Sequence, residues 1–183
     1  CLHEDTNVFS TSAIDRIENA AQETQKTLES APNGWLLRYY AGENYTGPAY
    51  SILMKFANGH ATVASDYDPD KVTTAAYSIA KDQGVVLSFD SYNESIHQFS
   101  RVWEGSGARG IEGDYEFLVL STSADTIRLR GKKWKNNMEL VRVPEKTEWK
   151  SYLTSIYNLH EHLTTQFFAL RLGKDTLAEA TLN

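Results

Sequence analysis

The chain has little that could cross-link it or carry it through a membrane. Its 183 residues include one cysteine, Cys1, and four prolines, and no stretch approaches the roughly 20 apolar residues of a membrane-spanning helix. One cysteine cannot form a disulfide within the chain. Hydrophobic residues make up 41% and charged residues 23%, which is the composition of a globular domain and excludes a disordered one.

Positive charge is also scarce. The formal net charge is −6, and a phosphate-binding surface needs clustered lysine and arginine, so we expect no nucleic-acid partner. The local exception is one basic run, Arg128–Lys133. Ile127 and Leu129 alternate with its first charges, which is typical of a half-buried strand. The run therefore predicts a solvated strand face followed by a turn.

The cysteine is the first residue, and this position suggests a lipid anchor. A leading cysteine remains when a lipoprotein signal peptide is removed and the new terminus is acylated. Each buried methylene contributes about 0.8 kcal/mol, so several acyl chains would hold a soluble domain firmly. We expect Cys1 to be the lipid attachment site. Apart from this covalent lipid, we expect no cofactor. A chain boundary that falls there by chance is the alternative.

The first third of the chain predicts a leash and a helix. Residues 1–11 are mostly polar, which favours a short solvated leash. Ser12, with Asp15 three residues later, is typical of a helix start. Apolar or small residues then recur at spacings of three and four, which predicts one buried helical stripe. These residues are Ile14, Ile17, Ala21, Thr24 and Leu28. The helix is expected to end at the turn residues 32–34.

From Trp35 the hydrophobic period changes to two, and we expect eight strands. They are residues 35–40, 50–56, 61–65, 73–80, 85–90, 115–120, 126–130 and 138–143. Asn58-Gly59 predicts a tight hairpin because both residues tolerate positive φ. Residues 92–103 predict a short helix or an ordered loop. Short strands with tight connections favour an antiparallel meander that closes into a barrel, since closure removes unpaired edges.

The predicted strands place bulky side chains on their inner faces. This set comprises Trp35, Leu37, Tyr50, Ile52, Met54, Phe56, Tyr77 and Phe89. An eight-stranded barrel is just wide enough for side chains, so we expect these residues to fill it. The fold class is therefore mainly β, with residues 12–143 forming one domain of helix plus barrel. Residues 144–183 predict a C-terminal helix from Thr147 to about His160 and a tail, in which Leu163–Leu172 reads as a further strand. They could also begin a truncated second region.

Several segments together resemble a family of Bacteroidetes lipoproteins of unknown function whose N-terminal region is lipocalin-like. The stretches that carry the resemblance are Cys1 with Glu4-Asp5, Phe9-Ser10, Trp35-x-Leu37-x-Tyr39-Tyr40, Met54-Lys55-Phe56, Val86–Asn93 with His97, Gly113–Phe117 and Ile127–Lys133. The resemblance covers residues 1–143. It implies a lipocalin-like barrel, while members of the family are usually longer than this chain.

The resemblance also implies a function. Such proteins are commonly encoded beside SusC/SusD-like systems, in which a TonB-dependent outer-membrane transporter works with nutrient-capturing lipoproteins. It implies an accessory lipoprotein on the cell surface, anchored in the outer membrane, that assists nutrient uptake. We expect it to be non-enzymatic and to contact the transporter assembly, the nutrient or both. Whether the nutrient is a glycan, a peptide or another compound stays open at this point. Glu4 and Asp5 resemble the acidic surface-export signal. A free-standing binding protein with a small ligand inside the barrel and a surface hydrolase are the alternatives.

Three patterns approach metal-binding or catalytic motifs. Asp66–Asp70 begins like a calcium loop, but Lys71 and Tyr77 stand where such a loop needs glycine and glutamate, so we interpret it as a solvated turn. His160–His162 lacks the four-residue spacing of a zinc helix and is interpreted as a helix end, where a cationic histidine suits the helix dipole. His97 is interpreted as a packed histidine. We expect no metal site.

Alternating carboxylates form a further candidate. Glu112, Asp114 and Glu116 could project from one strand face, and paired carboxylates are the apparatus of glycoside hydrolysis. Same-face neighbours on a strand are about 7 Å apart. That spacing alone does not define a cleft, so we interpret the group as a polar strand entrance and expect no catalytic residue.

Aromatic residues in the predicted loops and strand ends are the best candidates for a contact surface. Rigid aromatic faces can pack against a sugar, a peptide or a protein partner. Four residues qualify: Tyr45, Tyr92, Trp103 and Trp134. Each of them alone could instead cap an end of the barrel.

Overall fold

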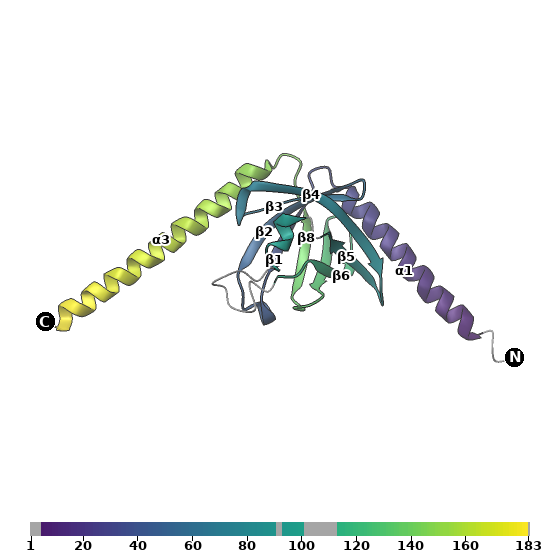
Figure 1. Cartoon of the computed structure of the whole chain (residues 1–183), viewed down its shortest axis with the longest axis horizontal. Coiled ribbons are helices and arrows are strands. Elements are labelled where there is room, and N and C mark those ends of the chain that lie inside the picture. The colour runs from purple at the N-terminus through teal and green to yellow at the C-terminus, as the bar shows by residue number, and fades with distance from the viewer. Residues whose placement is uncertain (1–4, 91–92, 101–112, 183) are drawn as a thin grey trace.

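A computed structural model describes the backbone of residues 5–90, 93–100 and 113–182, and their side chains apart from those of residues 5–11 and 174–182. The chain forms a closed barrel of eight antiparallel strands, flanked by a helix at each end of the sequence (Figure 1). The predicted fold class is confirmed. The two terminal helices, α1 and α3, lie on opposite sides of the barrel, and their terminal ends lie away from it.

The strands follow one another around the barrel in sequence order. They are β1 (Trp35–Tyr40), β2 (Ala49–Ala57), β3 (His60–Ser65), β4 (Asp68–Lys81), β5 (Val85–Phe89), β6 (Glu116–Thr122), β7 (Thr126–Gly131) and β8 (Asn137–Arg142). Each strand pairs with the next, and β8 pairs with β1 to close the ring. The predicted hairpin at Asn58-Gly59 joins β2 to β3, with φ values of 51° and 73°.

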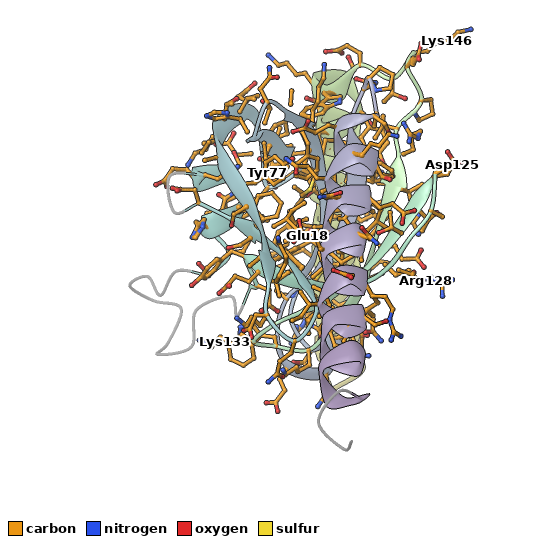
Figure 2. All side chains as sticks on the ribbon, turned by 90° about the vertical axis from the view of Figure 1, so that its right-hand side faces the viewer. Glu18, Tyr77, Asp125, Arg128, Lys133 and Lys146 are labelled. Carbon is orange, nitrogen blue, oxygen red and sulfur yellow. The ribbon has the colours of Figure 1, made fainter. Side chains whose placement is uncertain are left out.

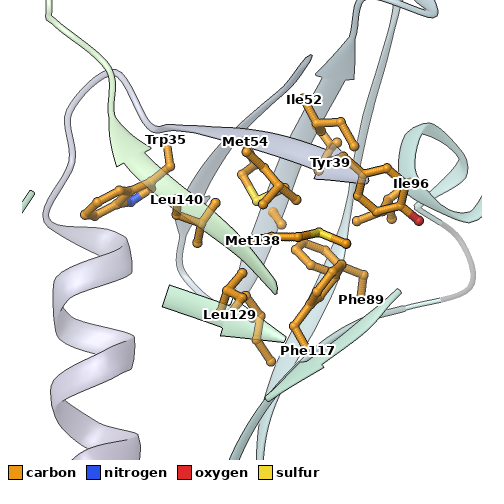
Figure 3. Packing of buried hydrophobic residues seen from close by; sticks show 14 of the residues in the cluster. Trp35, Tyr39, Ile52, Met54, Phe89, Ile96, Phe117, Leu129, Met138 and Leu140 are labelled. Carbon is orange, nitrogen blue, oxygen red and sulfur yellow. The ribbon is translucent and has the colours of Figure 1, made fainter. Parts of the chain in front are cut away.

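The interior of the barrel is packed with side chains from its own strands. Figure 3 shows Met54, Phe89, Phe117 and Leu129 converging from different strands. Phe56 packs edge-to-face on Tyr77, with ring centroids 4.9 Å apart. Most of the expected interior set is fully buried, although Tyr50 is only half-buried. Side chains at strand period two therefore form the core, as the alternation predicts.

Helix α1 (Asp5–Glu29) is longer than expected, and the leash predicted for residues 1–11 is wrong from Asp5 onward. The segment before Ser12 contains no glycine or proline, so nothing in it stops the helix from starting earlier. The predicted stripe is buried toward its C-terminal end, where Leu28 is fully covered, while Ile14 remains exposed. Figure 2, which looks onto α1, shows the helix running along the flank of the barrel.

Helix α3 (Trp149–Leu182) also exceeds its prediction, which ended near His160 and read Leu163–Leu172 as a strand. At a rise of 1.5 Å per residue its 34 residues span about 50 Å. Its first turns pack on the outside of β2 and β4. There Leu153 is fully buried in a small second core made with Leu53, Ala64 and Val143. Figure 1 shows the rest of the helix leaving the barrel.

Two further elements differ from expectation. Strand β4 begins at Asp68, before the predicted Thr73, because the register of β3 and β4 shifts between Ala64 and Ser65. Pro69 lies in this irregular stretch, where its missing N–H removes no hydrogen bond from the sheet. The predicted short helix is α2 (Glu94–His97).

Candidate functional site

One end of the barrel is closed by aromatic side chains. Phe99, which follows α2, is fully buried, and its ring centroid lies 5.0 Å from that of Tyr39 and 4.5 Å from that of Tyr50. Tyr67 packs edge-to-face on both Tyr50 and Phe99. Burial raises the pKa of Tyr50 to about 12, so its hydroxyl stays protonated at neutral pH. This end is therefore covered by packing.

The alternating carboxylates do not act together. Glu112 lies outside the described residues. Asp114 is buried, and its carboxylate accepts hydrogen bonds from the backbone N–H groups of Lys133, at 2.8 Å, and Trp134. Glu116 forms an exposed ion pair with Lys132 at 3.7 Å. Each described carboxylate is thus engaged with the turn between β7 and β8.

Asp114 has a structural role that its sequence pattern did not reveal. Burial raises the pKa of its carboxyl, and the hydrogen bonds from Lys133 and Trp134 oppose that shift. A Cβ added at Gly131 would overlap the carboxylate. Tyr39 donates its phenol hydrogen bond to the backbone carbonyl of Asp114 at 2.7 Å. The residue therefore fixes the β7–β8 turn to the barrel.

The calcium-like segment contains the predicted turn between strands, at residues 66–67, and most of it is exposed, but its first carboxylate is buried and serves the fold. Asp66 is buried, and it accepts a hydrogen bond from the backbone N–H of Ser51 at 3.0 Å. His160 on α3 lies 3.9 Å from the other carboxylate oxygen. His160 is accordingly a contact between α3 and the barrel, and interpreting it as a helix end was wrong because α3 continues to Leu182.

His97 is packed, as predicted. Its Nε2 lies 2.9 Å from the backbone carbonyl oxygen of Phe89, and its ring stacks on Tyr115 at 4.4 Å. The predicted basic strand face is also present, with Arg128 and Arg130 exposed on β7.

The predicted contact aromatics are placed only in part. Tyr92 and Trp103 lie outside the described residues, as do Cys1 and Glu4, while Asp5 is described only as the first residue of α1. The remaining two lie in neighbouring connections. Tyr45, in the β1–β2 loop, is 50% exposed, and Trp134 is partly exposed in the turn that follows β7. Asn136 and Asn137 beside Trp134 hydrogen-bond to Tyr45, so the two loops form one surface.

The outer part of α3 carries an apolar face that our sequence reading missed. Large side chains recur at spacings of three and four and so share one side of the helix. They are Ile156, Leu159, Leu163, Phe167 and Leu170, and we call them the α3 stripe. Phe167 is 67% and Leu170 is 68% exposed. The spacing itself was the available signal, but it was interpreted as a strand.

Two features that would indicate a function are not found among the residues that the structure describes. Across the part of the chain that the structure describes, no three or more histidine, cysteine, aspartate or glutamate side chains gather as metal ligands would. In the same part, neither long helix is apolar enough over a sufficient length to cross a membrane.

Comparison with known proteins gives a family and no closer relative. Neither the curated proteins nor the solved structures contain a match to the chain. A family model described as a domain of unknown function, DUF4302, matches residues 5–178, which takes in α1, the whole barrel and most of α3. The chain therefore belongs to the DUF4302 family.

Proposed function

We propose that this chain is a non-enzymatic accessory subunit of an outer-membrane nutrient-import complex, held at the cell surface by a lipid on Cys1. Its partner in this proposal is a SusC/SusD-like transporter assembly, as the family resemblance implies. The observation that carries the proposal is the exposed α3 stripe, which extends beyond the barrel (Figure 1).

The α3 stripe has the chemistry of a protein contact. Apolar side chains continue without a break along one helix face, from Tyr152 in the second core to Leu170 in solvent. Contiguous exposed apolar patches mark interaction sites, because water exposure of such area is unfavourable. Between Tyr157 and Gly173 the only lysine, arginine, aspartate or glutamate residues are Glu161 and Arg171. The matching partner surface is therefore an apolar groove or helix, bound with little dependence on salt.

The filled barrel supports recognition by outer surfaces. Trp35, Met54 and Phe117 have essentially no exposed surface, and they lie in the interior where a lipocalin-type ligand would sit (Figure 3). A free-standing carrier of a small apolar ligand would have to displace this packing, which is unfavourable at native density. The hydrolase alternative has less support, because Asp114 is engaged with the β7–β8 turn and Glu116 pairs with Lys132.

The family resemblance supports the lipid anchor in this proposal, because Cys1, Glu4 and Asp5 are among the residues that carry it. Replacing Cys1 with alanine in the natural host should release the protein from the membrane into the soluble periplasmic fraction. The Glu4→Ala/Asp5→Ala variant should keep the lipid and lose surface exposure, as measured by protease accessibility on intact cells. Membrane retention of the Cys1→Ala protein would contradict the anchor.

Partner binding is tested by extracting the native protein from membranes in mild detergent and identifying what purifies with it. We expect a transporter complex. The Phe167→Asp variant should lose the complex, because a charge in the α3 stripe would be buried without a partner. Thr165→Asp adds the same charge to the opposite face of the same helix and should keep the complex, since Thr165 is exposed and lies outside the stripe.

The outcomes separate the proposed roles. Loss of the complex in both variants would point to helix destabilisation, and retention in both would rule out the α3 stripe as the contact. A wild-type monomer that carries extractable lipid would replace the accessory role by the carrier role.

A further inference from the structure

The outer surface of the barrel carries a groove that neither the family nor the proposed partner contact explains. It has a volume of about 810 Å³ and lies along β1, β7 and β8, on a different part of the surface from the α3 stripe. We call it the β1–β8 groove. Its lining residues are Arg38, Tyr40, Tyr45, Leu120, Arg128, Leu129, Asn137, Met138 and Glu139. The volume is within the range of small-molecule sites.

The groove exists because the closing seam of the barrel is incomplete. Pairing between β1 and β8 runs over Trp35–Leu37 opposite Leu140–Arg142. Strand β1 nevertheless continues to Tyr40, and β8 begins at Asn137, so the last residues of β1 stand opposite the first of β8 without pairing as strands. A side chain closes the end of the seam instead. The Asn136 amide donates to the backbone carbonyls of Tyr40, at 3.2 Å, and Gly42, at 2.7 Å.

Tyr45 is held at this groove in an unfavourable backbone conformation. Its φ is 60° and that of Asn44 is 53°, in the left-handed region that bulky side chains rarely adopt. Three contacts keep it there. Its N–H donates to Asn136 Oδ1 at 3.2 Å, its hydroxyl accepts from the N–H of Asn137 at 2.9 Å, and its ring packs edge-to-face on Tyr40 at 5.5 Å. Tyr45 is 50% exposed, so the strained backbone presents an aromatic residue to solvent.

The charge of the groove is opposite to that of the chain. Arg38 and Arg128 line it together with one carboxylate, Glu139, whereas the whole chain carries a net charge of −6. Arg128 lies 3.5 Å from Glu139 and projects outward in Figure 2. Arg38 is exposed and has no ion-pair partner among the residues that the structure describes. A guanidinium offers paired N–H donors that match a carboxylate.

We propose that the β1–β8 groove binds a saccharide that carries a carboxylate, such as a uronic acid. The rings of Tyr40 and Tyr45 pack against the apolar face of a sugar, and Arg38 takes its carboxylate. Asn137 and Glu139 offer hydrogen bonds to sugar hydroxyls. An acidic peptide would also offer carboxylates to Arg38, but it has no sugar ring for the tyrosines and few hydroxyls for Asn137 and Glu139. This inference rests on the proposed function for its setting, because it names the nutrient chemistry that the subunit would capture.

The test is a calorimetric titration of the purified chain with trigalacturonate, maltotriose and a triglutamate peptide. We expect trigalacturonate to bind at least about tenfold more tightly than either of the others, as a charge-assisted pair predicts. Arg38→Gln should remove that preference while leaving weak binding of maltotriose. Tyr45→Ala should weaken both sugars. Lys55→Gln removes one exposed positive charge outside the groove and serves as the matched control.

Each other outcome overturns the inference. Equal affinities for trigalacturonate and maltotriose would remove the role of Arg38, and stronger binding of triglutamate would assign the groove to a peptide. An equal loss in Lys55→Gln would show only a general charge effect. Absence of binding to the folded chain, with circular dichroism unchanged, would leave the groove without this ligand. Co-purification with a transporter is measured separately, so failure of the saccharide and failure of the accessory role are distinguishable.

Discussion

Trp35 donates its indole hydrogen bond to the backbone carbonyl of Leu28 at 3.0 Å, and this bond joins α1 to the first strand of the barrel. Both residues are fully buried. The last carbonyls of a helix have no partner within it, so a buried one needs a donor from elsewhere. The Arg142 guanidinium lies over the same indole ring, 4.9 Å from its centroid. The helix end, β1 and β8 thus meet at one side chain.

Trp35→Phe should therefore lower the free energy of unfolding by more than the loss of buried ring area alone would. The Leu28 carbonyl would remain buried without a donor, which costs about 1–3 kcal/mol. Trp149 provides the matched control, because it makes a similar bond to Asn33 at 3.1 Å but is only partly buried. The free energy of unfolding in urea should fall further for Trp35→Phe than for Trp149→Phe. Equal losses would show that burial of the carbonyl is not the cause.

Local alternation predicted most of the barrel. On β2, Ile52, Met54 and Phe56 share the inner face, and the Asn58-Gly59 turn sets the register with β3. These features depend on residues close in sequence, where side-chain period and turn preference act directly. Barrel closure followed from the number of strands and the short connections between them, although no single segment specified it.

Features that depend on distant residues were not predictable in the same way. Asp114 resembled a member of a carboxylate pair because its partners at Lys133 and Trp134 become neighbours only after the strands pair. The length of α3 was missed because the apolar residues of Leu163–Leu172 were interpreted as a strand, although they continue the spacing of three and four from the first turns of the helix. The groove beside Arg38 was missed because it depends on where the pairing of β1 with β8 stops, and the sequence of either strand alone does not show this.

The packed interior makes a second prediction. Phe56→Ala should lower the free energy of unfolding by about 3–5 kcal/mol, because it removes a fully buried ring and leaves a cavity. The cavity should be apolar and able to take xenon or benzene. Lys55→Ala, at an exposed neighbour on the same strand, should change stability by about 0.5 kcal/mol or less. Benzene binding to the unmodified barrel would show that its interior is not filled.

The two parts of α3 should respond differently to the same substitution. Leu153→Ala removes a fully buried side chain from the second core and should cost about 2–5 kcal/mol. Leu163→Ala changes a residue that is 52% exposed, and the isolated chain should lose about 0.5 kcal/mol or less. Urea unfolding of the two variants checks this contrast. A large loss for Leu163→Ala would mean that the α3 stripe is already covered in solution, for instance by a second copy, which sedimentation would detect.

Asp114 predicts a pH dependence with a definite sign. Burial raises the pKa of its carboxyl in the folded state, so the folded chain holds this proton more tightly than the unfolded chain does. Its contribution to stability is therefore greatest below the ordinary aspartate pKa and falls as the pH rises toward the folded pKa. In Asp114→Asn the acceptor oxygen remains for the N–H groups of Lys133 and Trp134, but the titration is removed. Between about pH 3 and pH 7, the wild type should lose stability relative to this variant, as measured by urea unfolding at each pH.

The same measurement on Asp66→Asn should give the same sign, because burial raises the pKa of Asp66 as well. The opposing effects there are the N–H of Ser51 and the charge of His160, both of which favour the carboxylate. Asp66→Asn combined with His160→Gln should therefore show a smaller change in stability than the sum of the two single substitutions, since the two side chains interact.

The opposite sign would contradict the pH prediction for Asp114. If the wild type gained stability relative to Asp114→Asn as the pH rose, the hydrogen bonds from the β7–β8 turn would outweigh burial, and Asp114 would be held as a stabilised anion.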